Sequence, residues 1–205
     1  MLICFDMDGV IFKHNNFWIE LHKIYETHEK GLELTKKYLK TDYPKLVEEV
    51  VNKLWKNKPE SKFLELTNSL EYVEGAKELF TWLKDQGYKT AIISSGPRRL
   101  AERAKKDLNI DYIYTNELIF KDQKATGEFK WPIGADKKDE IFKKLCQENK
   151  LNPKDCIVVG HDHADLKMAR LAGISIGFCP EEQEHWNFVI NKRNLNEIIQ
   201  IIKKI

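Results

Sequence analysis

The chain has 205 residues, a length that suits one sizeable domain or one domain with an insertion. Hydrophobic residues make up 42% of it, enough to bury a core, and charged residues make up 32% but leave a net charge of only +2. This balance gives no electrostatic case for a nucleic-acid partner. No apolar run approaches the length of a membrane span, so we expect no membrane association either.

The cysteines are scattered and form no CxxC pair. They are Cys4, Cys146, Cys156 and Cys179. Most of them lie in apolar, strand-like runs, where cysteine behaves as a small buried hydrophobe. Because no secretory signal is visible, we expect reduced thiols, no metal cluster built from cysteines and a cytoplasmic protein.

The first strand ends in acidic residues. Residues 1–5 form an apolar run that predicts a buried strand, and Asp6, Asp8 and Gly9 follow at once. Two carboxylates this close repel each other and raise each other's pKa, so we expect a cation beside them or a chemical use for them. The alternative is a solvated turn, since Asp and Gly are common turn residues.

A long helical segment interrupts the strand pattern after residue 12. A second strand should follow within about 30 residues in a parallel α/β domain, but the helical pattern continues to residue 69. Apolar residues recur at helical spacing within 17–25, 46–55 and 61–70. We predict an all-helical cap, residues 13–70, inserted into an α/β core of residues 1–12 and 71–205; the alternative is a helical subdomain that serves only stability.

Strands and helices alternate over the rest of the chain. The predicted strands are 89–93, 112–114, a hairpin within 117–129, 156–159 and a last strand at 174–178. The predicted helices are one that opens at residues 74–76 and stops at Gly87, 98–108, 136–149, one that ends before Gly173, and 195–202. Such alternation predicts an α/β fold with a mostly parallel sheet and right-handed crossovers.

Polar residues follow three of these strands. They are Asp6 and Asp8 after the first, Ser94, Ser95 and Gly96 after the second, and the stretch 160–165 after a later one. Ligands bind at the carboxyl ends of strands in parallel sheets. Hydroxyl groups and free backbone N–H groups before a helix suit an anion, and carboxylates suit Mg²⁺. Together these hydroxyl, backbone N–H and carboxylate groups predict a site that binds a phosphate together with Mg²⁺.

A phosphate beside two carboxylates suggests a two-step reaction. One carboxylate can attack phosphorus and form an aspartyl-phosphate, while the second protonates the leaving alcohol and later activates water. A lysine is expected nearby to neutralise charge, and Lys137 or Lys138 at the start of a predicted helix is suitably placed.

Four motifs stand in order along the chain. They are Asp6-Met-Asp8-Gly-Val10, a strand that ends in Ser94-Ser-Gly96, Lys138-Asp-Glu-Ile141, and the acidic stretch from Gly160 to Asp165. In this order the chain resembles the haloacid dehalogenase-like superfamily, in its phosphoserine-phosphatase-like branch. The resemblance implies a Rossmann-like core and a Mg²⁺-dependent phosphatase that acts on a small phosphorylated metabolite, with phosphoserine among the candidates.

The resemblance also implies a role for each matching residue. Asp6 would be the nucleophile and a metal ligand, and Asp8 the general acid and base with its backbone carbonyl on the metal. Lys138 would stabilise the nucleophile and the charge of the transition state. The phosphoryl group would be bound by Ser94, Ser95 and Gly96, and the metal additionally by Asp165 and Asp162.

The fourth motif departs from the family pattern. His161 stands where the first acid is usual, and Asp162 comes one position later. Either Asp162 or Asp165 takes the ligand role with His161 turned aside, which we favour, or His161 itself ligates. Imidazole favours softer divalent ions, so another metal can replace Mg²⁺ in the last case.

The cap departs from the branch as well. No acidic residue there matches the one that recognises serine, and Glu20 and Glu26 are candidates only by type. His14, Asn15, Asn16 and Trp18 follow the first strand closely enough to reach the site, although helix capping by asparagine and a core tryptophan are the favoured explanations. The sequence predicts neither the substrate nor the oligomeric state. Two further functions compete: a phospho-acceptor receiver module, and a catalytically weak homologue that binds a ligand or partner.

Overall fold

The protein is built around one twisted sheet. The computed structural model describes residues 1–130 and 137–205, and within them the strand order is β4-β3-β2-β1-β5-β6-β7. The strands are β1 (Leu2–Phe5), β2 (Lys89–Pro97), β3 (Tyr112–Lys121), β4 (Lys124–Lys130), β5 (Cys156–Gly160), β6 (Ile174–Phe178) and β7 (Phe188–Ile190). Neighbouring strands are parallel except for the β3–β4 hairpin, which confirms the predicted α/β fold and mostly parallel sheet.

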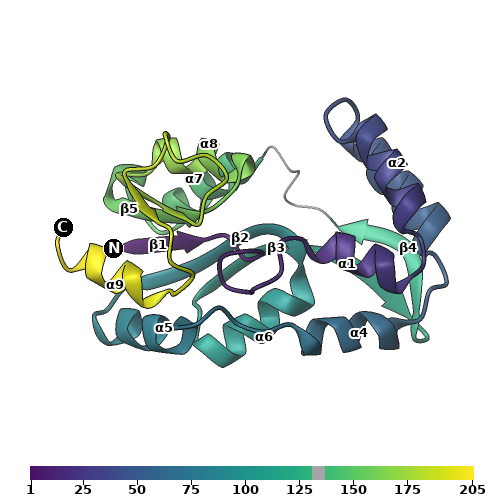
Figure 1. The fold of residues 1–205 in the computed structure, drawn as a ribbon, viewed down its shortest axis with the longest axis horizontal. Coiled ribbons are helices and arrows are strands. Elements are labelled where there is room, and N and C mark those ends of the chain that lie inside the picture. Colours follow the sequence, from purple (N-terminus) through teal and green to yellow (C-terminus); the bar gives the residue numbers. More distant parts are fainter. Residues whose placement is uncertain (131–136) are drawn as a thin grey trace.

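Strand β1 lies at the centre, and all four of its residues are buried. Its side chains alternate between two cores, with Ile3 and Phe5 in one and Leu2 and Cys4 in the other. Helices cover both faces of the sheet, as Figure 1 shows: α5 (Ala76–Asp85), α6 (Arg98–Leu108) and α9 (Asn196–Ile202) on one, α7 (Lys138–Glu148) and α8 (His163–Leu171) on the other. Because β2 and β5 flank β1, the carboxyl ends of these three strands are neighbours.

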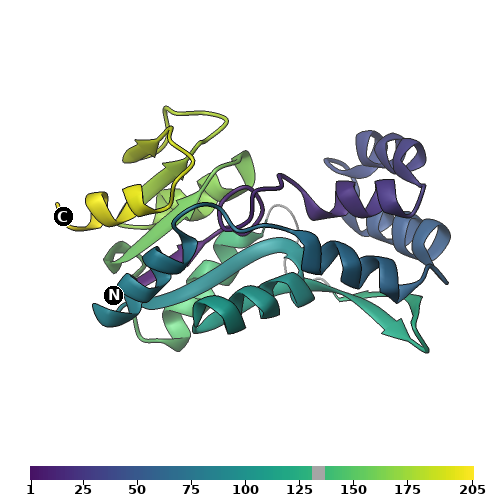
Figure 2. The ribbon, with the colours of Figure 1, turned by 60° about the horizontal axis from the view of Figure 1, so that its bottom comes forward.

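The helices between β1 and α5 gather at the end of the molecule opposite both termini (Figure 2). They are α1 (Phe17–Ile24), α2 (His28–Tyr38), α3 (Tyr43–Glu48), the π-helix η1 (Glu49–Trp55) and α4 (Glu60–Ser69). The β3–β4 hairpin reaches beside them, and Ala125 exchanges backbone hydrogen bonds with Asn57 and Lys58 just after η1. Helix α4 lies along α6, where Glu60 pairs with Arg99 at 2.7 Å.

The chain leaves the core and returns to it at one narrow point. Lys13 N donates to Glu71 O at 3.0 Å, and Val73 N donates to Ile11 O at 2.9 Å. The segment that enters the insertion and the segment that leaves it thus pair directly with each other. This pairing supports boundaries near residues 13 and 70 for a cap domain, and that division stays a prediction.

Four details of the sequence-based fold need correction. The predicted second strand ends at residue 93, but β2 continues to Pro97, so Ser94, Ser95 and Gly96 lie within the strand and not in a turn after it. The predicted strand 112–114 and the first arm of the hairpin form one continuous strand, β3. Residues 174–178 are not the last strand, because β7 follows; its three residues are too few to show a period. The helix expected from Asp136 begins at Lys138, and Asp136 itself lies outside the described residues.

Within the described part of the chain, no helix combines the length and apolar character that crossing a membrane requires. All four cysteines are free, as expected from their spacing.

Arg103 of α6 ties the helical insertion to the core. Its guanidinium donates to Thr67 O at 2.5 Å and to Leu70 O at 2.7 Å. The same group lies over the rings of Phe12 and Tyr72, 5.2 Å and 4.9 Å from their centroids. One side chain therefore satisfies the carbonyls that end α4 and stacks on the two rings where the chain leaves and re-enters the core.

We expect Arg103→Gln to lower the free energy of unfolding by about 2 kcal/mol, because two carbonyls and two ring contacts lose their partner. Urea denaturation measures this change. The matched control is Arg98→Gln on the same helix, whose exposed pair with Glu102 should be worth less than about 0.5 kcal/mol. Equal losses in both variants would contradict this role for Arg103.

His22 of α1 makes the stability of the insertion depend on pH. The side chain is buried, and its Nδ1 lies 2.7 Å from Thr27 Oγ1 while its ring packs against Trp55. Burial, helped by the nearby His28, lowers the pKa of His22 from 6.5 to about 4. Between these two pH values the unfolded chain binds a proton at His22 that the folded protein does not. The contribution of neutral His22 to the free energy of unfolding is therefore full above pH 6.5 and is lost as the pH falls toward 4.

Lowering the pH from 7 to 5 should therefore cost the wild type on the order of 1 kcal/mol more stability than it costs His22→Gln. Urea denaturation at both pH values measures the difference. His185→Gln, which changes a well-exposed histidine, is the control and should follow the wild type. A wild-type pH dependence retained in His22→Gln would show that another group titrates.

Candidate active site

Asp6 is held at the end of β1 by the sheet itself. Its N–H donates to Val159 O at 2.9 Å, which continues the β1–β5 ladder by one residue, and its side chain is buried. Gly9 then turns the chain with φ +74, a left-handed conformation that favours glycine. Its N–H donates to His14 O at 2.7 Å, so the acidic segment forms a closed loop above the strand.

A lysine joins two of the predicted carboxylates. Lys138 Nζ, at the first position of α7, donates to Asp6 Oδ1 at 2.8 Å and to Asp165 Oδ1 at 2.7 Å. The exposed fractions are 2% for Asp6, 3% for Lys138 and 0% for Asp165, so the cluster is shielded from water. Lys137, the sequence-based alternative, is exposed. The cation expected beside the first strand is therefore present.

The cluster controls the charge of its members. Burial alone would raise the pKa of Asp6, but the Lys138 ammonium and His161 hold it well below its usual range. Burial would lower the pKa of Lys138, yet Asp165 and Asp6 raise it instead. Burial and the neighbouring Asp6 charge raise the pKa of Asp165. Asp6 is thus the member kept ionised, facing a charged lysine.

The loop after β5 wraps around Asp165. Its Oδ2 accepts the N–H groups of His161 at 2.8 Å and Asp162 at 3.3 Å. A Cβ at Gly160 would come within 2.5 Å of the Asp165 Cβ, so only glycine allows this close approach. Both oxygens of Asp165 already accept hydrogen bonds, which fixes the carboxylate that orients Lys138.

The ring of His161 points into the site. Its Nδ1 lies 3.3 Å from Asp6 Oδ2 and 3.7 Å from Asp165 Oδ2. The ring fills the space over Gly9, where an added Cβ would lie 3.0 Å from its Nε2. Burial alone would lower the pKa of His161, but Asp6 raises it to about 9. The expectation that His161 turns aside is wrong, because Gly9 leaves room for the ring and Asp6 attracts it.

Asp162 serves the fold with one of its oxygens. It is the N-cap of α8, and its Oδ1 accepts from Ala164 N at 2.9 Å and Asp165 N at 3.2 Å. Its predicted role as a metal ligand stays a prediction that would have to use the remaining oxygen.

One group of side chains could hold a metal ion. Ligand atoms of Asp6, His161 and Asp165 lie within 4.8 Å of one another. Within the described residues His161 Nδ1 is also buried and makes no hydrogen bond, although Asp6 Oδ2 lies 3.3 Å away. Two carboxylates and an imidazole fit a divalent cation, and the orphaned nitrogen supports such a fit.

Asp8 is held from the start of the helical insertion. Its Oδ1 lies 3.0 Å from His14 Nε2, and its Oδ2 accepts the N–H of Phe17 at 2.9 Å. The sequence placed His14 within reach of the site but offered no signal for this partner. The insertion therefore orients the predicted general acid directly.

The end of β2 lies against Asp8. Ser94 is buried, and its Oγ accepts the N–H of Gly96 at 3.1 Å. A Cβ on Gly96 would clash with Met7 Cε at 2.5 Å and lie 3.3 Å from both Asp8 Oδ1 and Ser94 Oγ. The predicted phosphate-binding residues, which lie in the last part of β2, are thus in contact with the first motif, as their positions at neighbouring strand ends implied.

Ser95 is anchored through its carbonyl. Its O accepts from Trp18 Nε1 at 2.9 Å and from Asn116 Nδ2 at 3.1 Å. Trp18 belongs to α1 and Asn116 to β3, so this carbonyl connects the insertion, β2 and the hairpin strand. The role of Asn116 was not predicted from the sequence, where it is one polar residue in an alternating run.

Comparison with known proteins agrees with this arrangement. The sequence matches the haloacid dehalogenase-like hydrolase family over residues 1–173. It is 31% identical to the phosphoserine phosphatase of Methanocaldococcus jannaschii, over 98% of this chain and 97% of that protein. The phosphoserine phosphatase of Archaeoglobus fulgidus is 30% identical over 98% of this chain, which spans 60% of that relative's length.

The fold comparison gives the same result. A solved structure of a phosphoserine phosphatase with a phospho-aspartyl intermediate analogue has a TM-score of 0.84 and 29% identity, and the match covers 98% of this chain and 97% of that chain. The chain belongs to the haloacid dehalogenase-like hydrolase family, in its phosphoserine-phosphatase-like branch, and is a phosphatase.

Proposed function

We propose that this phosphatase hydrolyses a small phosphomonoester through an aspartyl-phosphate formed on Asp6. The observation that carries the proposal is the buried, ionised Asp6 carboxylate, which lies 2.8 Å from the Lys138 ammonium and at the end of the central strand. A charged carboxylate shielded from water is a competent nucleophile for phosphorus. Because the relatives are phosphoserine phosphatases, phosphoserine is the reference substrate.

The reaction needs two carboxylates with different tasks. Asp6 attacks phosphorus as the bond to the leaving alcohol breaks, and Asp8 gives that alcohol a proton. Asp8 then takes a proton from the water that hydrolyses the aspartyl-phosphate and releases inorganic phosphate. The contacts of Asp8 with His14 and with the N–H of Phe17 support this role, because they orient its carboxyl group beside the nucleophile.

The phosphoryl group would be bound at the end of β2. Ser94 offers its hydroxyl, and the backbone N–H groups of Ser95 and Gly96 lie before the N-terminus of α6. Lys138 adds a fixed positive charge that stabilises the developing negative charge. The contact between Gly96 and Asp8 supports this arrangement.

Mg²⁺, or another divalent metal, completes the proposal. Asp6, the Asp8 backbone carbonyl and one of Asp165 and Asp162 would hold it, and the position of His161 supports the imidazole as an additional ligand. When bound, the cation offsets the negative charge that the phosphate and the carboxylates bring together. We further propose that the enzyme is cytoplasmic, which its free cysteines support.

The two competing functions lose support. A receiver module has no large helical insertion after its first strand, whereas this chain resembles phosphatases over nearly its whole length. A catalytically weak homologue was suggested by His161, but the predicted nucleophile keeps its lysine and its charge.

Substitution of the two carboxylates should separate their tasks. We expect Asp6→Asn to lose turnover of an aryl phosphate and to form no phosphoenzyme in intact-protein mass spectrometry, because an amide cannot attack phosphorus. Asp8→Asn should slow turnover about 10²–10⁴-fold and still accept one phosphoryl group, since an aryl leaving group needs little protonation.

The matched control is Asp139→Asn on α7, which removes only a surface pair with Lys143 and should retain the wild-type rate. Circular dichroism checks that each variant is folded. Wild-type turnover by Asp6→Asn would exclude the covalent mechanism.

The preference of the enzyme among divalent metals tests whether the His161 imidazole is a metal ligand. We expect the wild type to be more active with Mn²⁺ or Co²⁺ than with Mg²⁺, and His161→Asp to shift the preference toward Mg²⁺, because a carboxylate suits the harder ion better than an imidazole does. Steady-state rates across Mg²⁺, Mn²⁺, Co²⁺ and Ni²⁺ measure this shift. An unchanged preference would make His161 a bystander, and activity without any metal in both proteins would overturn the proposed metal dependence.

A further inference from the structure

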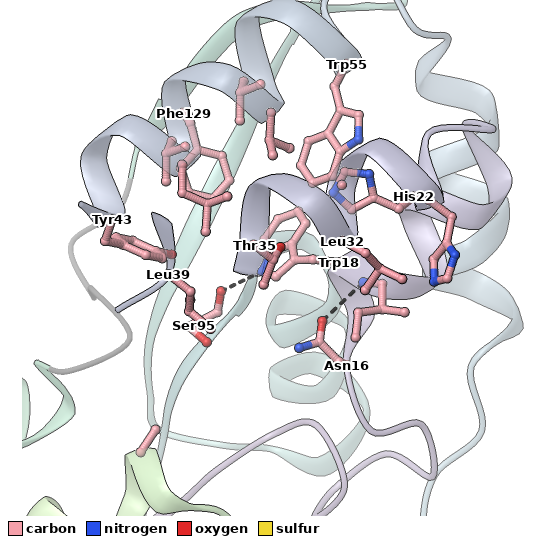
Figure 3. Close-up of a pocket in the computed structure, with 18 of the residues that line it drawn as sticks. Asn16, Trp18, His22, Leu32, Thr35, Leu39, Tyr43, Trp55, Ser95 and Phe129 are labelled. Atoms are coloured by element: carbon pink, nitrogen blue, oxygen red, sulfur yellow. Dashed lines mark hydrogen bonds between the residues drawn. The ribbon is translucent and has the colours of Figure 1, made fainter. Parts of the chain in front are cut away.

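A cavity of about 340 Å³ opens between the helical insertion and the end of the sheet. Figure 3 shows side chains from α1, α2 and the α3–η1 segment around it, with Phe129 of β4 and Ser95 of β2 completing the wall. Asp162 and Ala164, at the start of α8, line it from the core. Its volume lies in the range of small-molecule sites, roughly 300–1,000 Å³.

The cavity lies next to the candidate active site. Ser95 lies between Ser94 and Gly96 among the proposed phosphate-binding residues, and Asp162 follows His161 directly. Trp18, another wall residue, donates its Nε1–H to Ser95 O at 2.9 Å. A phosphomonoester whose phosphorus faces Asp6 would therefore extend its leaving group into this cavity.

Aromatic rings form the wall beside Ser95. Trp18 stacks on Trp55, with ring centroids 5.6 Å apart, and Phe129 meets Trp18 edge-on at 5.4 Å. These packed rings present an apolar surface to the cavity.

Exposed apolar side chains gather at the same cavity. Among the described residues only five large hydrophobic side chains are exposed, and two of them, Met1 and Ile205, end the chain. The other three are Ile19 at 38%, Leu32 at 39% and Leu39 at 41%, and all of them line the cavity. A soluble protein rarely leaves apolar groups together in water unless they bind a partner or a ligand.

Among its described residues, the wall offers no Lys or Arg for the carboxylate of an amino-acid leaving group. The polar side chains among the described residues that line it include those of Asn16, His22, His28, Thr35 and Asp162, so an α-carboxylate would find no permanently charged cation there. Glu20, one of the two sequence candidates for serine recognition, pairs with Lys23 at 2.8 Å outside the wall, and Glu26 does not line the cavity. Burying the carboxylate of a zwitterion without such a cation is unfavourable.

We propose that the preferred substrate is a monoester whose leaving alcohol carries an apolar group of about phenyl size, and that Leu32 of α2 and Leu39, the C-cap residue of that helix, help to select it. This rests on the proposed phosphatase reaction at Asp6 and names the substrate class of the same site. The apolar group lies against the Trp18 and Phe129 wall, while the ester oxygen reaches Asp8.

The first experiment compares kcat/KM for four alkyl phosphates: 2-phenylethyl phosphate, ethyl phosphate, phosphoserine and phosphocholine. All four release a primary alcohol, so differences report mainly on recognition of the leaving group. We expect 2-phenylethyl phosphate to exceed each of the others by at least about tenfold. A value for phosphoserine or phosphocholine that equals or exceeds it would overturn the proposal and leave the phosphatase reaction intact.

Calorimetric binding of the same four esters to Asp6→Asn separates this proposal from the reaction on which it rests. Tighter binding of 2-phenylethyl phosphate without turnover in the wild type would refute the proposed reaction and retain the ligand class. Binding without preference among the four esters would refute the ligand class.

Variants of α2 test the wall itself. In the double variant Leu32→Gln, Leu39→Gln, the ratio of kcat/KM for 2-phenylethyl phosphate to that for ethyl phosphate should fall about tenfold, because polar groups replace the apolar surface. Lys36→Gln, an exposed position on the same helix that does not line the cavity, should keep the wild-type ratio. An unchanged ratio in the folded double variant would contradict selection by these leucines.

Discussion

The active site depends on one ammonium group that two buried carboxylates share. Lys138 lies at 2.8 Å from Asp6 and 2.7 Å from Asp165, and these residues come from α7, the end of β1 and the start of α8. Burying any one of these charges alone would be costly, and removing one partner leaves another uncompensated. The three elements are therefore fixed relative to each other by the same contacts that keep Asp6 ionised.

Most of the fold and much of the site could be predicted from the sequence. Buried strands appear as short apolar runs, and residues at their carboxyl ends must meet at one edge of a parallel sheet, which brought Asp6, Ser94 and Asp165 together in advance. The residues alone did not show whether Lys137 or Lys138 lies beside the carboxylates, because this depends on how α7 is rotated against the sheet. The short β7 carried no periodic signal at all.

The orientation of His161 and the partners of Asp8 could not be predicted for a different reason. The His161 ring lies in a space that exists only because Gly9 has no side chain, and Asp8 is oriented by His14 and the N–H of Phe17. These contacts depend on the path of the chain as it enters the insertion. The helices between β1 and α5 thus contribute to the polar site as well as to the cavity beside it.

The two parts of this site have opposite physical character, and that difference divides their tasks. The polar part, around Asp6, holds charge in a fixed geometry, which suits chemistry on a phosphoryl group common to all monoesters. The apolar part, around Trp18 and Leu39, would in the proposed reaction distinguish esters by the surface of the leaving group. They meet at the Trp18–Ser95 hydrogen bond, so a movement of α1 would change the binding of the alcohol and of the phosphate together. If the proposed reaction and substrate class hold, selectivity would therefore be coupled to catalysis through the carbonyl of Ser95.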